Sequence, residues 1–161
     1  MAYEIVVEDV AARPIAAVHA SVPLGGVATA WRPALDKVWA FLRSHDGLRT
    51  DGHNIFVYHH PVRPGAQMAV DFGVEVSRAF ADEGVIVFMH TPAGQAASTV
   101  HVGRPDQLAG ANAAIEAWCR ANHRPLAGVC VNTISPSGSN GRPTSTPKST
   151  SIGAAGKTGW W

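Results

Sequence analysis

The side chains in this sequence that could bind a metal or attack a substrate include eight histidines and two cysteines. His59 and His60 are adjacent, so in a strand they point to opposite faces and cannot easily share a metal. No His-x-x-x-His or Cys-x-x-Cys spacing of the kind found in structural zinc sites occurs in the chain. Cys119 and Cys130 fall within apolar patterns, which favours small core residues over nucleophiles. The sequence therefore predicts no metal site and no disulfide framework.

Motifs of enzymes are missing or incomplete. The Gly-x-Ser-x-Gly elbow of serine hydrolases does not occur. Residues 153–158 end like a phosphate-binding loop but lack the Gly-x-x-x-x-Gly-Lys-Ser/Thr spacing, so we treat the match as chance. We predict no catalytic residue and no cofactor, and the sequence favours a binding protein over an enzyme.

Carboxylates are better candidates for a functional role. Residues 68–76 alternate in hydrophobicity as a half-buried strand does, with Phe72 on the apolar face. Asp71 and Glu75 share the opposite face, which we expect to be solvated. The functional alternative is that this face lines an open cleft.

Aromatic residues divide into two groups by position. Trp39 and Trp118 occupy helix positions that face a sheet, which predicts core packing. Trp31 and Tyr58 lie near the ends of their elements, where a side chain can reach a cleft.

The elements that position these residues repeat. An apolar run at 14–22, a helical pattern at 28–44 and a strand at 54–58 form one unit, and Pro33 indicates that its helix begins near Trp31 or Arg32. A run at 97–102, a helical pattern from 106 and a strand at 126–131 form the second. Further strands are expected at 3–10, 68–76 and 84–90. Two such units predict an α+β fold: two strand-helix-strand repeats, a mostly antiparallel sheet and both helices on one face.

Composition limits the possible partners and the cellular location. The chain has 161 residues, 46% of them hydrophobic, which fits one globular domain. A net charge of +1 gives no electrostatic argument for direct nucleic-acid contact. No apolar run approaches the ~20 residues of a membrane helix, and the acidic N-terminus is unlike a signal peptide. With only two cysteines, a cytoplasmic protein is expected.

The character of the chain changes near its end. We predict a folded domain over 1–134 and a low-complexity, disordered tail over 135–161, rich in Ser, Thr, Pro and Gly. The tail is either natural or the product of a frameshift, because other codon choices give a plausible strand in another frame. Both explanations stay open. Either way the sheet is expected to lack its last strand and to self-associate through an exposed edge along 126–131.

Two segments, Val70–Val76 and Gly94–Gly103, followed by Leu108 and Trp118, carry a family resemblance. Over residues 3–131 the chain resembles the gyrase-inhibitor-like effector-binding domains of bacterial drug-sensing transcription regulators. The family usually has an aromatic residue after its His-x-Gly element, where this chain has Arg104 and Pro105.

The resemblance implies an aromatic-lined cleft between the repeats, with a buried glutamate that attracts lipophilic cations. Asn132 occupies the position where that glutamate is expected, which predicts weaker selection for cations. The predicted ligand-binding residues are Trp31, Tyr58, Phe72, Glu75, Phe88 and Asn132.

The resulting hypothesis is a stand-alone domain that binds lipophilic or aromatic small molecules, as an effector-binding or drug-sensing module whose regulatory role needs a partner chain. One alternative is a hydrolase of small electrophilic compounds on the same fold. The other is a protein-binding inhibitor of a DNA topoisomerase.

Overall fold

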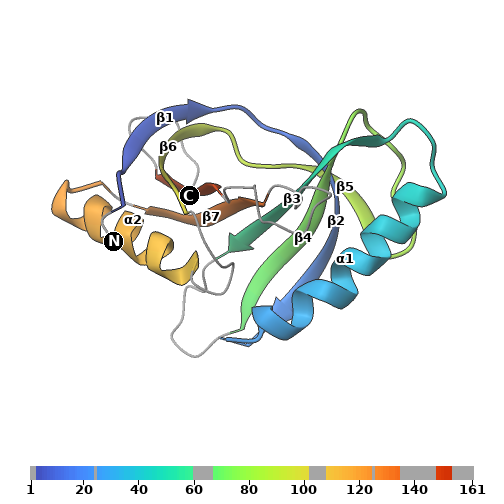
Figure 1. Ribbon diagram of the computed structural model, residues 1–161, viewed down its shortest axis with the longest axis horizontal. Coiled ribbons are helices and arrows are strands. Elements are labelled where there is room, and N and C mark those ends of the chain that lie inside the picture. The colour runs from blue at the N-terminus through green and yellow to red at the C-terminus, as the bar shows by residue number, and fades with distance from the viewer. Residues whose placement is uncertain are drawn as a thin grey trace, which may run out of the picture.

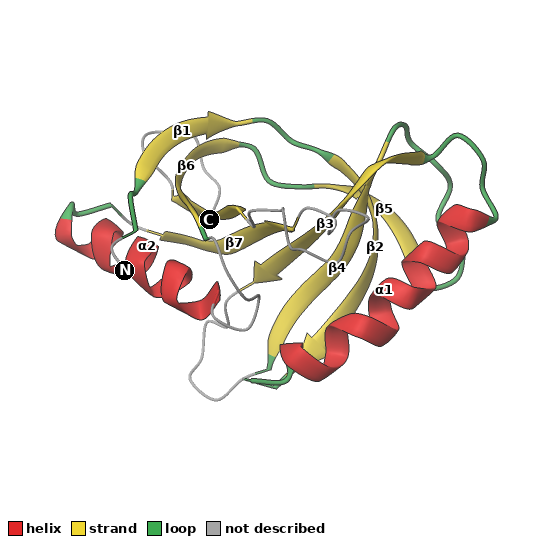
Figure 2. Cartoon of the chain, viewed as in Figure 1, coloured by secondary structure: helices red, strands yellow, loops and turns green. Residues whose placement is uncertain are grey.

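The computed structural model describes residues 3–23, 25–59, 67–101, 108–124, 126–134 and 148–153. These residues form an eight-stranded sheet and two helices, shown in Figures 1 and 2. The strands are β1 (Val6–Val10), β2 (Pro14–Val22), β3 (Arg49–His59), β4 (Met68–Val76), β5 (Ile86–His90), β6 (Gly94–Val100), β7 (Leu126–Ile134) and β8 (Lys148–Gly153); the helices are α1 (Val27–Arg43) and α2 (Leu108–Ala121).

Strand order shows the duplication. The sheet runs β1-β6-β8-β7-β3-β4-β2-β5, and every pairing between its strands is antiparallel. In the first repeat β4 lies between β2 and β3, and in the second β8 lies between β6 and β7. The outer strands are exchanged: β1 pairs with β6, and β5 pairs with β2. Each predicted strand-helix-strand unit is thus followed by a further strand, and the predicted α+β class is confirmed.

Both helices cover the same face of the sheet. Residues directly opposite each other in antiparallel strands share a face. The register links Ala97 in β6, through β8, to Cys130, Tyr58 and then Val70 in β4. Ala97 packs with Ile115 of α2, and Val70 belongs to the cluster packed beneath α1. In Figure 1 the two helices accordingly flank the pair β3 and β7.

Helix α1 matches the helical pattern expected at 28–44 but not the later start inferred from Pro33. It starts at Val27, so the prediction of a start near Trp31 or Arg32 is wrong, and Pro33 lies inside the helix. Proline removes the bond that its own nitrogen would give to the carbonyl of Thr29. Both Pro33 and Thr29 are exposed, so water can satisfy that carbonyl. No described helix is long and apolar enough to cross a membrane.

The structure corrects the prediction of a missing last strand. Strand β8 pairs with β6 on one side and β7 on the other, so the edge along 126–131 is covered and cannot mediate the predicted self-association. The composition of β8 was misleading because a strand paired on both sides is held by backbone hydrogen bonds, which need no apolar pattern. The remaining parts of the predicted tail, 135–147 and 154–161, lie outside the described residues.

The core has a part on each face. Beneath α1, Val38, Phe72 and Val74 are almost completely buried. On the helix-free face, Ile15 and Ile55 belong to a second cluster, against which Val10 and Met89 of the outer strands pack. The outer strands therefore close over the face that neither of the two described helices covers, here called the helix-free face.

The two tryptophans predicted to be core residues lie at its margins. Trp39 and Trp118 are both partly buried and pack against clusters formed by other residues. The central apolar contact of α2 is made by Ile115, which is 0% exposed and packs with Ala97 and Cys119.

This placement gives a stability prediction. Ile115→Ala should lower the free energy of unfolding by about 2–5 kcal/mol, because it opens a cavity in a closed site. Trp118→Ala should lower it less, because part of that side chain is already in water. Urea unfolding followed by circular dichroism measures both variants. A Trp118 variant that is less stable than the Ile115 variant would show that the face of α2 is assigned wrongly.

Candidate functional site

The two repeats meet where β3 pairs with β7. In this pair Phe56 lies opposite Asn132, and Tyr58 lies opposite Cys130. All four belong to the face that carries the helices, because Phe56 is opposite Phe72 of the cluster beneath α1. We call these four residues, together with Asn112 of α2, the seam.

The seam is polar but carries no charged side chain. Asn132 is 1% exposed and hydrogen-bonds with the side chain of Tyr58. The Cys130 thiol lies 3.6 Å from Asn112 Oδ1 and 3.8 Å from Asn132 Oδ1. Burial raises the pKa of Tyr58 to about 12, and the hydrogen bond with Asn132 offsets a smaller part of that shift. Tyr58 is therefore a neutral phenol near neutral pH.

Only two of the predicted ligand-binding residues, Tyr58 and Asn132, meet at the seam. Phe72 is 0% exposed and contacts Phe56 edge-to-face, with ring centroids 5.0 Å apart, so it supports the seam from below α1. Trp31, on α1, packs against the margin of the same cluster.

The other two predicted residues lie elsewhere. Phe88, on β5, packs against Phe80 with a centroid distance of 5.4 Å, at the far edge of the sheet. Glu75 is on the helix-free face, where its Oε2 lies 3.6 Å from Arg13 Nε. Alternation along β4 gave the face of Glu75 correctly, but that face is not the one that carries the seam.

Sequence reasoning did not assign Asn112 or Cys130 to the site. Cys130 is two residues before Asn132 in one strand, so the period of two already placed both on one face. Asn112 could not be found in this way, because its contact depends on how α2 packs over β7.

The expectation that Asp71 is solvated is wrong. Asp71 is 5% exposed and accepts hydrogen bonds from two histidines on the neighbouring strands. The distance from His19 Nδ1 to Oδ1 is 2.7 Å, and that from His59 Nε2 to Oδ2 is 2.8 Å. The carboxylate is thus buried but fully paired, a structural arrangement on the helix-free face.

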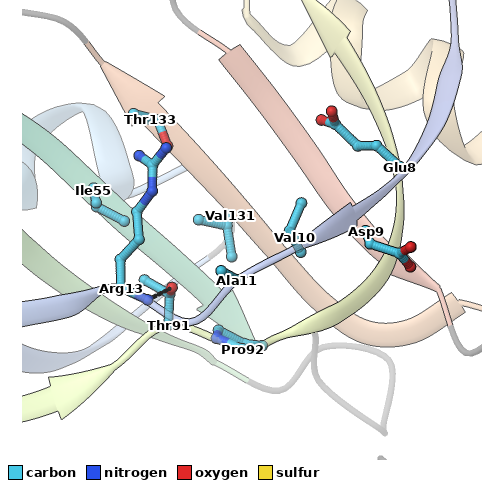
Figure 3. Close-up of a pocket in the computed structure, with 10 residues that line it drawn as sticks. All are labelled: Glu8, Asp9, Val10, Ala11, Arg13, Ile55, Thr91, Pro92, Val131 and Thr133. Carbon is cyan, nitrogen blue, oxygen red and sulfur yellow. Dashed lines mark hydrogen bonds between the residues drawn. The ribbon is translucent and has the colours of Figure 1, made fainter.

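The helix-free face also contains a cavity of about 270 Å³, shown in Figure 3. Its floor is formed by β3 and β7, and its walls by β1 and the segments that lead from β1 to β2 and from β5 to β6. The lining residues are Glu8, Asp9, Val10, Ala11, Arg13, Ile55, Thr91, Pro92, Val131 and Thr133. The β3–β7 pair therefore has the seam on one face and this pocket on the other.

The chain belongs to the GyrI-like small molecule binding domain family, which it matches over residues 3–135. No curated protein matches the sequence.

Solved structures show the same fold. The C-terminal domain of EcmrR superposes with a TM-score of 0.75 at 19% identity, over 96% of this chain and 99% of that one. In a cryo-EM structure of an EcmrR–DNA complex the match spans 56% of the EcmrR chain. SAV2435 bound to tetraphenylphosphonium gives a TM-score of 0.67 at 9% identity, over 96% and 94% of the two chains. A hydrolase from Listeria innocua gives 0.60 at 9% identity, over 94% and 92%.

The buried phenol of the seam can be tested by titration. The chain has two tyrosines, so tyrosinate absorbance should show one ionisation with a midpoint of about 12, absent from Tyr58→Phe. Because the pKa is raised above its unfolded value of 10.0, stability from this group is complete below pH 10.0 and is lost as the pH rises through the folded pKa. A Tyr58 midpoint close to 10.0 would mean that the seam is open to water.

Proposed function

We propose that this domain binds lipophilic or aromatic small molecules at the seam, with a preference for neutral ligands, and acts as the ligand-sensing module of a regulatory system. The observation that carries the proposal is the buried Asn132, in contact with Tyr58 at the junction of the repeats. A ligand bound at this junction would touch both repeats at once, as a sensor needs if binding is to alter their relative arrangement.

The preference for neutral ligands is a consequence of desolvation. A cation that leaves water for a buried site loses much of its hydration energy and needs a paired anion to recover it. Asn132 offers an amide dipole instead of a negative charge, and Tyr58 stays protonated. An aromatic ligand needs no such compensation: its ring can pack on Tyr58 while a polar substituent bonds to the amide or the phenol.

The solved relatives support a binding role in different ways. A solved structure shows SAV2435 bound to tetraphenylphosphonium, a lipophilic cation, and another shows EcmrR in a complex with DNA. The first shows that this fold can hold a large aromatic ligand. The second shows the fold within a DNA-binding protein, in line with a sensing role here through attached or partner domains.

The two alternatives have less support. One structural neighbour is described as a hydrolase, but the likeness extends to the fold alone. The five seam residues include neither a carboxylate nor an imidazole to act as a general acid or base. For inhibition of a topoisomerase, no described surface offers a specific argument.

The experiment installs the missing charge. Asn132→Asp changes the amide to a carboxylate of the same shape, and Asn132→Glu reproduces the residue that the family resemblance implies. Both should strengthen binding of rhodamine 6G, a fluorescent lipophilic cation, by about 1–3 kcal/mol through a charge-assisted contact. A neutral aromatic competitor should displace the dye from the unsubstituted chain more readily than from either variant.

A matched control adds the same charge away from the seam. Gln67 is exposed and accepts a hydrogen bond from Ser21 Oγ, which Gln67→Glu preserves. This variant should leave dye binding unchanged. If the unsubstituted chain binds rhodamine 6G more tightly than neutral aromatics, and Asn132→Asp has no effect, the seam is not the site.

A further inference from the structure

The pocket on the helix-free face is separate from the seam. Its floor residues Ile55 and Val131 belong to the apolar cluster opposite the helices, whereas Asn132 and Phe56 point to the helix side. A molecule in this pocket would thus bind through the other face of the same two strands. Its binding does not require that the seam bind a ligand.

Charge at the pocket is divided between two ends. Arg13 lies at one end, and in Figure 3 its side chain extends across Ile55 toward Thr133. Glu8 lies at the other end, with its carboxylate turned back toward the side where Arg13 lies. Asp9 also lines the pocket, but its side chain points away from Arg13. The pocket therefore presents one cationic and one anionic group from opposite sides.

The backbone of Arg13 is held by two hydrogen bonds, whereas its guanidinium group can still bind a ligand. Its N–H donates to Thr91 Oγ1 at 2.8 Å, and its carbonyl accepts from the Thr91 N–H at 2.9 Å. The side chain is 50% exposed, and its contact with Glu75 is a long one, 3.6 Å through Nε. The two terminal nitrogens, which form the planar fork that recognises a carboxylate, extend toward the pocket.

Glu8 is also held in place. Its carboxylate accepts a hydrogen bond from Ser98 Oγ at 2.8 Å. The residue is partly buried in β1, where β1 pairs with β6. A carboxylate can accept several hydrogen bonds, so Glu8 can bind an ammonium group alongside its protein partners.

Apolar surface separates the two charges. Val10 and Val131 lie between Arg13 and Glu8, Ile55 lies beside the Arg13 side chain, and Pro92 completes the wall. At about 270 Å³ the cavity is slightly smaller than the usual range for drug-sized ligands, so it suits a short molecule. A ligand with a single charge would satisfy one end and leave the other end facing an apolar group.

We propose that this pocket binds a small zwitterion whose ammonium and carboxylate groups are separated by an apolar spacer. The carboxylate pairs with Arg13 near Thr133, the ammonium pairs with Glu8, and the spacer lies over Val131. Because the two protein charges are at opposite ends, an ω-amino acid fits this pattern and an α-amino acid, whose charges are adjacent, does not.

The experiment uses four probes of similar size with the full chain in isothermal titration calorimetry. 6-Aminohexanoate has both charges apart, norleucine is its isomer with the charges adjacent, and hexanoate and hexylamine have one charge each. We expect 6-aminohexanoate to bind at least about tenfold more tightly than the other three. Equal binding of norleucine, hexanoate or hexylamine, or no saturable binding of 6-aminohexanoate, would overturn the proposal.

Variants assign the two ends. Arg13→Gln should reduce the affinity for 6-aminohexanoate to that for hexylamine, and Glu8→Gln should reduce it to that for hexanoate. Glu4→Gln and Arg43→Gln make the same charge changes at exposed positions outside the pocket and should leave binding unchanged. Circular dichroism confirms that each variant is folded, and if Arg13→Gln unfolds, the Glu8 variant and the probe series still decide.

Asn132→Asp separates this site from the seam, since it should alter binding of lipophilic cations and leave binding of 6-aminohexanoate within about twofold. Loss of zwitterion binding in Asn132→Asp, or its retention in both Glu8→Gln and Arg13→Gln, would contradict a distinct site on the helix-free face.

Discussion

The backbone pairing of β3 with β7 is the contact on which the rest of the molecule depends. It is the only pairing among the described strands that joins the last strands of the two strand-helix-strand units, and it turns two half-sheets into one. Because side chains alternate along a strand, this one pair of strands also supplies the floor of two different surfaces. Phe56 and Asn132 point to the helix side, and Ile55 and Val131 point to the other. A shift of register by one residue would exchange the two sets, moving the amide of Asn132 to the helix-free face.

The exchange of outer strands makes the repeats interdependent. β1 leads into the first repeat but pairs with β6 of the second, and β5 does the reverse. The two connecting segments meet where Arg13 and Thr91 bond to each other. A repeat alone would therefore lack its outer strand and leave Ile15 and Ile55 uncovered, so cooperative folding of the described sheet as one unit is the expected behaviour. The same meeting point forms the wall of the pocket, which is why that pocket can exist only when both repeats are in place.

Sequence reasoning succeeded where a local period carries the information and failed where distant segments meet. The two strand-helix-strand units and the shared helix face are encoded in periods of 3.6 and 2. Alternation alone placed Glu75 and Phe72 on different faces of β4. Strand β8 has no apolar period and is held on both sides by backbone bonds, which leave no mark in the composition, so composition predicted a tail there. The burial of Asp71 depends on His19 and His59, contributed by two other strands, and the pocket depends on the crossing of two connections. None of these contacts leaves a signal in the sequence around a single residue.

The seam is an intermediate case. The family resemblance singled out Tyr58 and Asn132, whereas the role of Asn112 could be seen only from the packing of α2.

The distribution of charge between the two faces has the same origin in side-chain alternation. Asp71 and Glu75 lie an even number of residues apart in β4 and so share a face. Glu8 of β1 pairs with Ala96, which belongs to the same face, so all three carboxylates lie on the helix-free side. Each has a partner there: Asp71 has two imidazoles, Glu75 has Arg13, and Glu8 has the hydroxyl of Ser98. The five seam residues include no carboxylate, imidazole, ammonium or guanidinium group. On the two faces of the β3–β7 pair the polar groups therefore differ: the seam offers neutral dipoles, and the helix-free face carries carboxylates with polar partners. With a net charge of +1, long-range attraction contributes little to ligand selection. Selection at either surface must therefore come from short-range contacts. A charged ligand that loses its hydration can find an opposite charge at Arg13 or Glu8 on the helix-free face, but it finds none among the seam residues.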